Sequence, residues 1–510
     1  MNLKKILMSI TILLLCSCAS LDYRTKQNDL KNELVKKNYT GAINIINKKD
    51  FIPEERSELL NKLEKGTTHY LNGNYFQAMQ YFTKAQEISD NLYTISLKGK
   101  LAGALNANLD NYYGEIYERS LIRFYESLIH YDLYRVGKYE SYTSEDENGN
   151  KIVIPEKILT DSEKRTHLMA SKSVIREWDS MLNSYYEKLA DKPAYKSDII
   201  AKLFGAFIYE TSGSNEDKQI ALQLYKDAKT VLFRYYNNYP TFNTKSEDFT
   251  KNFKKFPKMN INEIEKKFVN ETEFSTNLIK FIDSKIADLS KNNKDNLIIV
   301  LKEGFVSPKI AKTIKIPIPA MYFNLSQQDL FMFTMLLGLD NVNGLPLIEF
   351  ELPYVAEKKI DSKIIAKISQ NGLTIKEFPI IVSNPISDIA HKTFKENELA
   401  MTTKITTSAI VKYSTAFLTA YSIYQQQQDS IGKLAAISSY KLSEKLIKNS
   451  LKADTRYWST LTDNIRVGST KLKTGNYQLD LYLIQNNIET KIYSQNINIT
   501  NEQNIIDINL

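Results

Sequence analysis

The sequence predicts an α+β protein with an N-terminal domain of helical repeats, β-rich segments after it and a small β-sandwich at the C-terminus. Up to about residue 290, apolar residues recur at intervals of three and four with few prolines, which is typical of amphipathic helices. Beyond residue 295, short runs of alternating apolar and polar residues indicate strands, with one helical segment between them.

The first twenty residues have the pattern of an export signal. Two lysines precede an apolar core that is too short to span a bilayer, since a spanning helix needs roughly 20 apolar residues. The following Leu15-Cys16-Ser17-Cys18 resembles the lipobox of bacterial lipoproteins, in which a small residue precedes the lipid-bearing cysteine. We expect lipid attachment at Cys18, with a plain secretory signal as the alternative. Ala19, in place of aspartate, implies transfer to the outer membrane of a Gram-negative cell, on its periplasmic face.

Composition excludes several classes of protein. Both cysteines lie in the signal region, so the mature chain has no disulfide, thiol nucleophile or cysteine metal site. With 43% hydrophobic residues, 32 Tyr and 22 Phe, the chain is expected to be globular, and 510 residues suggest two or more domains. The net charge of +8 comes from 67 basic and 59 acidic residues, a mixed balance that does not indicate a nucleic-acid partner.

A repeat motif lies in the helical region. The positions that define a tetratricopeptide (TPR) repeat are occupied in one register by Gly66, Gly73, Tyr75, Ala78, Phe82 and Ala85. The last four share one face of a helix, where the small alanines let a paired helix approach closely. Gly66 serves the same approach on the first helix, and Gly73 ends the turn.

Weaker copies of this motif occur on either side. One contains Tyr39, Ala42 and Ile46, and the other has Ala221, Tyr225 and Ala228. Together they predict a TPR-like domain, with an unspecific α-helical bundle as the alternative.

The most aromatic helix is expected from residue 111 to about residue 136. Its stripe includes Tyr113 and Tyr117, and such stripes are more often core than ligand site. Glu115, Glu118 and Arg119 lie beside the stripe, where paired carboxylates usually form a solvated face.

Strands are predicted at residues 297–301, 314–318, 348–352, 364–368, 373–378, 477–483 and 506–510. Asn371-Gly372 predicts a tight turn between two of them. The expected organisation is a signal peptide (1–17), a tether (18–28), a TPR-like domain (29–290), a β-rich domain (295–387), a helical segment (388–452) and a β-sandwich-like domain (453–510).

Signatures of catalysis are missing from the sequence. It has no G-x-S-x-G, no H-E-x-x-H and no glycine-rich phosphate loop. Its four histidines, His69, His130, His167 and His391, lie far apart, and none pairs with another at metal-ligand spacing. We therefore expect no catalytic residue, metal or cofactor.

Two short motifs go beyond generic composition: Tyr117-Glu118-Arg119, and a later stretch containing Asp454, Arg456 and Trp458. Both resemble motifs of a family of bacterial TPR-containing outer-membrane lipoproteins with no assigned activity, as do residues 303–308 and 472–477. The sequence departs from that family at residues 425–428, which are glutamines instead of smaller, glycine-rich residues. The resemblance implies a role in the cell envelope but no reaction.

Two functions are compatible with these features. The first is a lipid-anchored scaffold whose stacked repeats bind another envelope protein. The alternative is an enzyme or a small-molecule or glycan carrier acting on peptidoglycan or another envelope polymer, with Glu115 and Glu118 as its chemistry. Asp454, Arg456 and Trp458 are expected to fasten the last β-domain to the helical body, because they lie where a long helix ends and strands begin.

Overall fold

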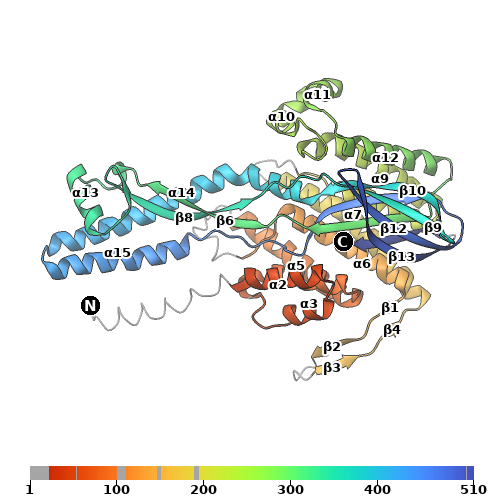
Figure 1. Ribbon diagram of the computed structural model, residues 1–510, viewed down its shortest axis with the longest axis horizontal. Coiled ribbons are helices and arrows are strands. Elements are labelled where there is room, and N and C mark those ends of the chain that lie inside the picture. Colours follow the sequence, from red (N-terminus) through yellow and green to blue (C-terminus); the bar gives the residue numbers. More distant parts are fainter. Residues whose placement is uncertain (1–21, 53, 100–110, 146–150, 189–194, 501) are drawn as a thin grey trace.

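The computed structural model describes residues 22–52, 54–99, 111–145, 151–188, 195–500 and 502–510, and its first half is helical (Figure 1). The helices are α2 (Asp22–Val35), α3 (Tyr39–Ile46), α4 (Glu54–Leu71), α5 (Tyr75–Gly99), α6 (Ile116–Val136), α7 (Asp161–Lys188), α8 (Ile199–Ser212), α9 (Asn215–Arg234), α10 (Ser246–Asn252), α11 (Ile261–Phe268) and α12 (Glu273–Ser290). Successive helices from α4 to α9 pack against one another, and α12 packs on α9. The predicted helical region is confirmed in this coarse sense.

The N-terminal part differs from expectation. Helix α2 begins at Asp22, although a tether was predicted as far as residue 28. Gln27 and Leu30 are buried, and the Gln27 amide donates to Glu64 on α4 at 2.9 Å, so α2 is held by the helical body. Cys18 and the predicted signal segment lie outside the described residues.

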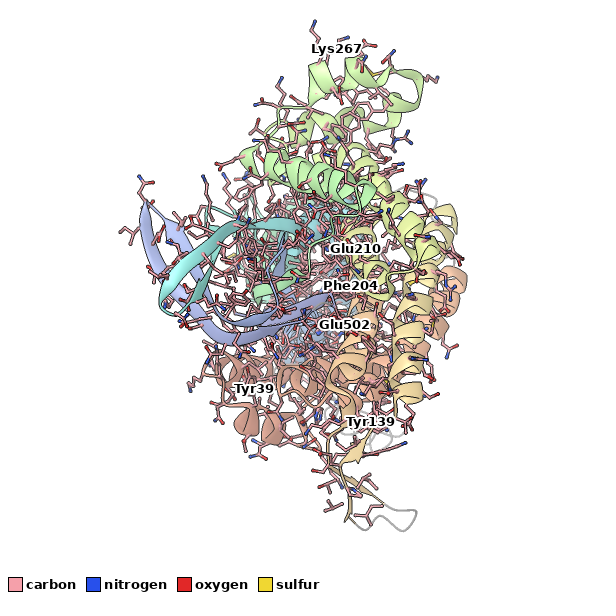
Figure 2. The ribbon with its side chains drawn as sticks, turned by 90° about the vertical axis from the view of Figure 1, so that its right-hand side faces the viewer. Tyr39, Tyr139, Phe204, Glu210, Lys267 and Glu502 are labelled. Carbon is pink, nitrogen blue, oxygen red and sulfur yellow. The ribbon has the colours of Figure 1, made fainter. Side chains whose placement is uncertain are left out.

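Short strands separate α6 from α7. They are β1 (Lys138–Tyr139), β2 (Tyr142–Glu145), β3 (Lys151–Ile154) and β4 (Lys157–Ile158), paired as β1–β4 and β2–β3. Figure 2 shows this hairpin, marked by Tyr139, projecting from the helices.

The main sheet has seven strands in the order β13-β12-β9-β10-β11-β5-β14. They are β5 (Leu297–Phe305), β9 (Lys363–Gln370), β10 (Leu373–Pro385), β11 (Thr462–Thr470), β12 (Gly475–Gln485), β13 (Ile488–Ile499) and β14 (Asn504–Asn509). Every pair is antiparallel except β14 with β5. The last four strands therefore belong to the same sheet as three earlier ones, and the prediction of a separate C-terminal sandwich is wrong.

Strand β5 shows how this sheet is buried on both faces. Ile298 and Val300 join the core shared with the helices, whereas Ile299 and Leu301 join a second core inside the sheet. That second core also includes Ile497 of β13, although β13 and β5 are far apart in the strand order. The sheet must therefore curl on itself, as Figure 2 shows beside the helices. The apolar run predicted for a buried strand is confirmed.

A long arm extends from the body (Figure 1). It contains β6 (Lys309–Pro317) paired with β8 (Leu345–Val355), the short β7 (Asn341–Val342), α13 (Gln327–Leu336) and the helical hairpin α14 (Ile386–Gln426) and α15 (Ser430–Ser450). The two hairpins bury a third core, centred on Phe333 and Phe417. The arm thus combines strands from the predicted β-rich domain with the predicted helical segment. Within the described residues, no helix is both long and apolar enough to cross a membrane.

Candidate functional site

The segment of residues 453–461, here called the junction segment, lies between α15 and β11 and has no regular secondary structure. All its residues except Asp454 are buried. A buried irregular segment must find partners for its backbone N–H groups outside any helix or sheet, because an unpaired buried N–H is costly. The hydrogen bonds of these N–H groups therefore show which parts of the molecule hold the junction segment in place.

Two buried carboxylates on the helices accept those N–H groups. Glu118 of α6 accepts from the Trp458 N–H at 2.9 Å, and Glu64 of α4 accepts from the Ser459 and Thr460 N–H groups at 2.7 and 3.2 Å. The Thr460 hydroxyl also donates to Glu64, at 2.6 Å. Burial raises the pKa of both carboxyl groups, and the donors oppose the rise. The two acids thus replace the missing backbone partners of the segment.

The side chains of Trp458 and Arg456 add further contacts between the junction segment and the helices. The indole of Trp458 packs against Phe82 of α5 and Tyr125 of α6, whose rings stack on each other, and its N–H donates to the Thr67 hydroxyl at 2.9 Å. Arg456 binds the Asp454 carboxylate through two nitrogens, at 2.9 and 2.7 Å.

Helix α4 is shaped to receive Arg456. Its backbone departs from helical geometry at Ser57, which frees the carbonyl of Arg56. That carbonyl accepts from Arg456 at 3.1 Å and from the Tyr112 N–H at 2.7 Å. The predicted junction residues Asp454, Arg456 and Trp458 therefore lie together, in contact with helices α4 to α6.

The residues near the start of α6 are drawn into the same cluster. Arg119 donates twice to the carbonyl of Tyr113, and Glu115 forms an ion pair with Lys309 at 3.1 Å. Tyr117 is buried in the core. The expectation of a solvated carboxylate face is wrong for Glu118, which is only 1% exposed, whereas the Glu115 side chain is 39% exposed. Its oxygens accept from this chain's own donors, so no acceptor position faces solvent for a substrate.

The residues of the repeat motif lie on the helical hairpin α4–α5 and in its turn. Gly73 has a φ of +78° in the turn between α4 and α5, and Ala78, Phe82 and Ala85 are fully buried. A Cβ on Gly66 would lie 2.9 Å from the Phe82 ring, so the close approach predicted there is real. Tyr75 is only partly buried.

A buried charge cluster joins the helices to the sheet elsewhere. Lys302 of β5 pairs with Asp507 of β14 and lies over the ring of Tyr70 at 4.5 Å. The Tyr70 hydroxyl donates to Asp132 at 3.2 Å, and burial raises the pKa of Asp132 to about 6. The groups satisfy one another, which favours a structural role.

Sequence reasoning missed one histidine pair. The Nδ1 atoms of His130 on α6 and His167 on α7 are 2.9 Å apart, and the Tyr139 hydroxyl lies 2.8 Å from His167 Nε2. Burial, and then the neighbouring ring, lowers the pKa of His130 to about 4. No sequence signal could have found the pair, because only helix packing brings positions 130 and 167 together.

The end of the arm has an exposed apolar surface. We define the arm tip as residues 318–345 and 424–437, which lie together because Phe333 of α13 contacts Tyr424 of α14. Large hydrophobic side chains exposed there are Met321, Tyr322, Phe331, Met332, Met335, Val342, Ile431 and Leu434. This is a dense concentration for so short a part of the chain, and such patches mark interaction sites.

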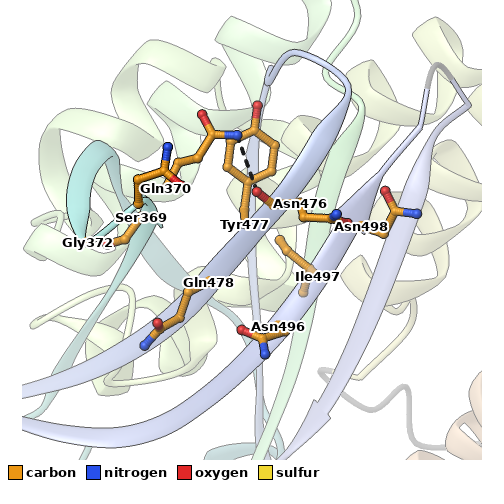
Figure 3. Close-up of a pocket in the computed structure, with 10 residues that line it drawn as sticks. Ser369, Gln370, Gly372, Asn476, Tyr477, Gln478, Asn496, Ile497 and Asn498 are labelled. Atoms are coloured by element: carbon orange, nitrogen blue, oxygen red, sulfur yellow. Dashed lines mark hydrogen bonds between the residues drawn. The ribbon is translucent and has the colours of Figure 1, made fainter.

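A hollow of about 540 Å³ lies between the β9–β10 turn and the paired strands β12 and β13 (Figure 3). Carboxamide side chains dominate its lining, and we call it the amide hollow. In the part of the chain that the structure describes, no three His, Cys, Asp or Glu side chains gather as a metal-binding group.

Comparisons with known protein families, with curated proteins and with solved structures found no match.

Proposed function

We propose that this chain is a lipid-anchored envelope protein that acts as a scaffold and binds another envelope protein through its arm tip. The observation that carries the proposal is helix α13, which after its polar first turn has large apolar side chains on its exposed face as well as on its buried face. A helix of this kind is normally buried all round, whereas a helix on a protein surface keeps a polar outer face.

The two faces of α13 differ in what covers them. Leu330 and Phe333 are buried against the arm, while Phe331, Met332 and Met335 remain 49%, 54% and 55% exposed. Flexible, polarisable methionines suit an interface that must fit a partner's irregular surface. The exposed face therefore supports a docking role.

Charge favours a protein partner over a lipid surface. The arm tip contains one basic residue, Lys433, and three aspartates, Asp329, Asp340 and Asp429, so its formal charge is negative. Anionic bilayers attract basic segments, so an acidic tip is poorly suited to them. An apolar groove with a basic rim on another protein would match both properties of the tip.

The helical repeats support the scaffold but offer less free surface than the sequence suggested. The hairpins α4–α5 and α8–α9 carry the residues of the TPR motif, which supports a TPR-like stack. However, the junction segment of the same chain already covers the surface where α4, α5 and α6 meet. For this reason we assign the partner site to the arm tip. Anchoring at Cys18 in the outer membrane, facing the periplasm, remains part of the proposal.

Site-specific photo-crosslinking in cells tests this assignment. A benzoylphenylalanine placed at Met335 should form an adduct with one protein, because that side chain lies on the exposed face of α13. The matched control is Met169 on α7, which is similarly exposed at 58% but lies outside the arm. An adduct at Met335 that is absent at Met169, and that disappears when Phe331 and Met332 are changed to serine, would support the proposal. Equal adducts at both positions, or adducts with lipid alone, would contradict it.

A further inference from the structure

The amide hollow differs chemically from the rest of the surface. Its lining includes the carboxamides Gln370, Asn371, Asn476, Gln478, Asn496 and Asn498 and no charged side chain, although 25% of the chain is charged. A volume of about 540 Å³ lies within the range of small-ligand sites, roughly 300–1,000 Å³. The hollow therefore suits a ligand that is polar and uncharged.

Strand register places the carboxamides in pairs. Asn476 lies opposite Asn498 and Gln478 opposite Asn496 in the β12–β13 ladder, and Ser369 of β9 lies opposite Gln478 on the other side. Directly opposed side chains are about 5 Å apart, and alternate residues on a strand are about 7 Å apart. Four carboxamides thus form a compact grid on one face of the sheet, as Figure 3 shows in part.

The β9–β10 turn beside this grid has a defined conformation. Asn371 and Gly372 have φ values of 51° and 79°, which fit a tight hairpin turn, and the Gln370 amide donates to the carbonyl of Asn476 at 3.3 Å. This bond links the β9–β10 turn to β12, so one wall of the hollow is fixed before any ligand arrives. A fixed wall lowers the entropic cost of binding.

We propose that the amide hollow binds a neutral glycan. Each carboxamide both donates and accepts hydrogen bonds, as the hydroxyl and acetamido groups of a neutral sugar do. An anionic ligand would find no cation in the lining, and an apolar ligand would offer the carboxamides no hydrogen-bond partner. The Gln478 amide nitrogen already donates to Asp480 at 3.0 Å, which orients this carboxamide.

A peptide is the other ligand to consider, because β13 is an edge strand of the sheet. An added peptide strand pairs with the backbone of the edge, whereas the carboxamides of Gln478 and Asn496 project from a face of the sheet. The geometry points to the glycan. This inference does not depend on the function proposed for the arm tip.

Calorimetric titration of the full chain with chitohexaose, a neutral oligomer of N-acetylglucosamine, tests the inference in a detergent without a sugar headgroup. We expect saturable binding, weakened about tenfold or more in the double variant Gln478→Ala/Asn496→Ala, because two hydrogen-bonding groups are lost. The matched control is Gln495→Ala, an exposed neighbour on β13 that does not line the hollow, and it should bind within about twofold of the unchanged chain.

Other outcomes of this titration would overturn the inference. No binding of chitohexaose, or equal binding by the double variant, would exclude a glycan site here. Heparin that binds more tightly than chitohexaose, and is lost in the double variant, would assign an anionic polymer instead. The double variant should keep its crosslink at Met335, so failure of this inference is distinguishable from failure of the arm-tip proposal.

Discussion

Replacing Trp458 by alanine should release the junction segment from the helices. The Trp458 side chain is fully buried, with ring centroids 5.8 Å from Phe82 and 5.4 Å from Tyr125. Removing a buried tryptophan leaves a cavity and costs about 3–5 kcal/mol. A folded protein is usually stable by about 5–15 kcal/mol, so the variant should fold but open this segment far more often.

The second tryptophan provides a matched control. Trp178 on α7 is also fully buried, and its N–H donates to the Ser120 hydroxyl at 2.7 Å, but it lies outside the junction. Urea unfolding of each alanine variant measures the free energy of unfolding, and trypsin cleavage after Lys452 and Arg456 measures local opening. In Trp458→Ala, cleavage should rise at least about a hundredfold and depend weakly on urea, because only a segment opens. In Trp178→Ala, cleavage should depend steeply on urea, because it requires global unfolding.

Two results would refute this reasoning. A loss of less than about 1 kcal/mol in Trp458→Ala would mean that the indole is not part of a packed core. Identical cleavage kinetics and urea dependence in the two variants would mean that the junction segment does not open as a unit.

The remaining predictions concern three other places. Gly66→Ala should lower the free energy of unfolding by about 1–3 kcal/mol, because its Cβ would meet the Phe82 ring at 2.9 Å; unchanged urea midpoints would argue against that contact. The pKa of His130 is about 4 in the folded protein, below its ordinary value of 6.5, so the unfolded chain binds the proton more tightly. The contribution of His130 to stability is therefore present above pH 6.5 and is lost as the pH falls towards 4. Its size is at most about 3 kcal/mol, and His130→Asn should lose less stability than the unchanged chain between pH 7 and pH 5, whereas an equal loss would exclude His130 as a source. Cys18→Ser should move the protein from the membrane pellet to the supernatant after a carbonate wash, since several acyl chains are needed for firm anchoring; recovery in the pellet would show another means of attachment.

Local patterns accounted for most elements that have a clean apolar period. The run at residues 297–301 became β5, and Asn371-Gly372 formed the predicted turn. Strand β11 was missed because its buried residues are largely polar: Arg466 is 1% exposed and is paired with Glu303 at 2.8 Å and with the carbonyl of Ser362. A buried polar strand has no apolar period, so only its tertiary partners identify it.

The division into domains failed for a related reason. The sequence separates β5 from β14, yet Lys302 and Asp507 on those strands are paired across 205 positions. Strand pairing depends on the register and partner that bury the most apolar surface, and neither is a local property. The curled sheet therefore combines two segments that composition alone had assigned to different domains.

The sequence by itself determined the apolar period of elements such as β5, the glycines that permit close approach, and the motifs that contain Glu118 and Trp458. Only the tertiary structure decided that these two residues, 340 positions apart, are joined by a hydrogen bond from the Trp458 N–H to the Glu118 carboxylate. It also decided that Glu118 is buried, because a carboxylate in a helix is stable away from water only when donors from elsewhere in the chain reach it. Local periodicity follows from the geometry of one helix or strand, whereas burial and pairing depend on which distant segments pack together.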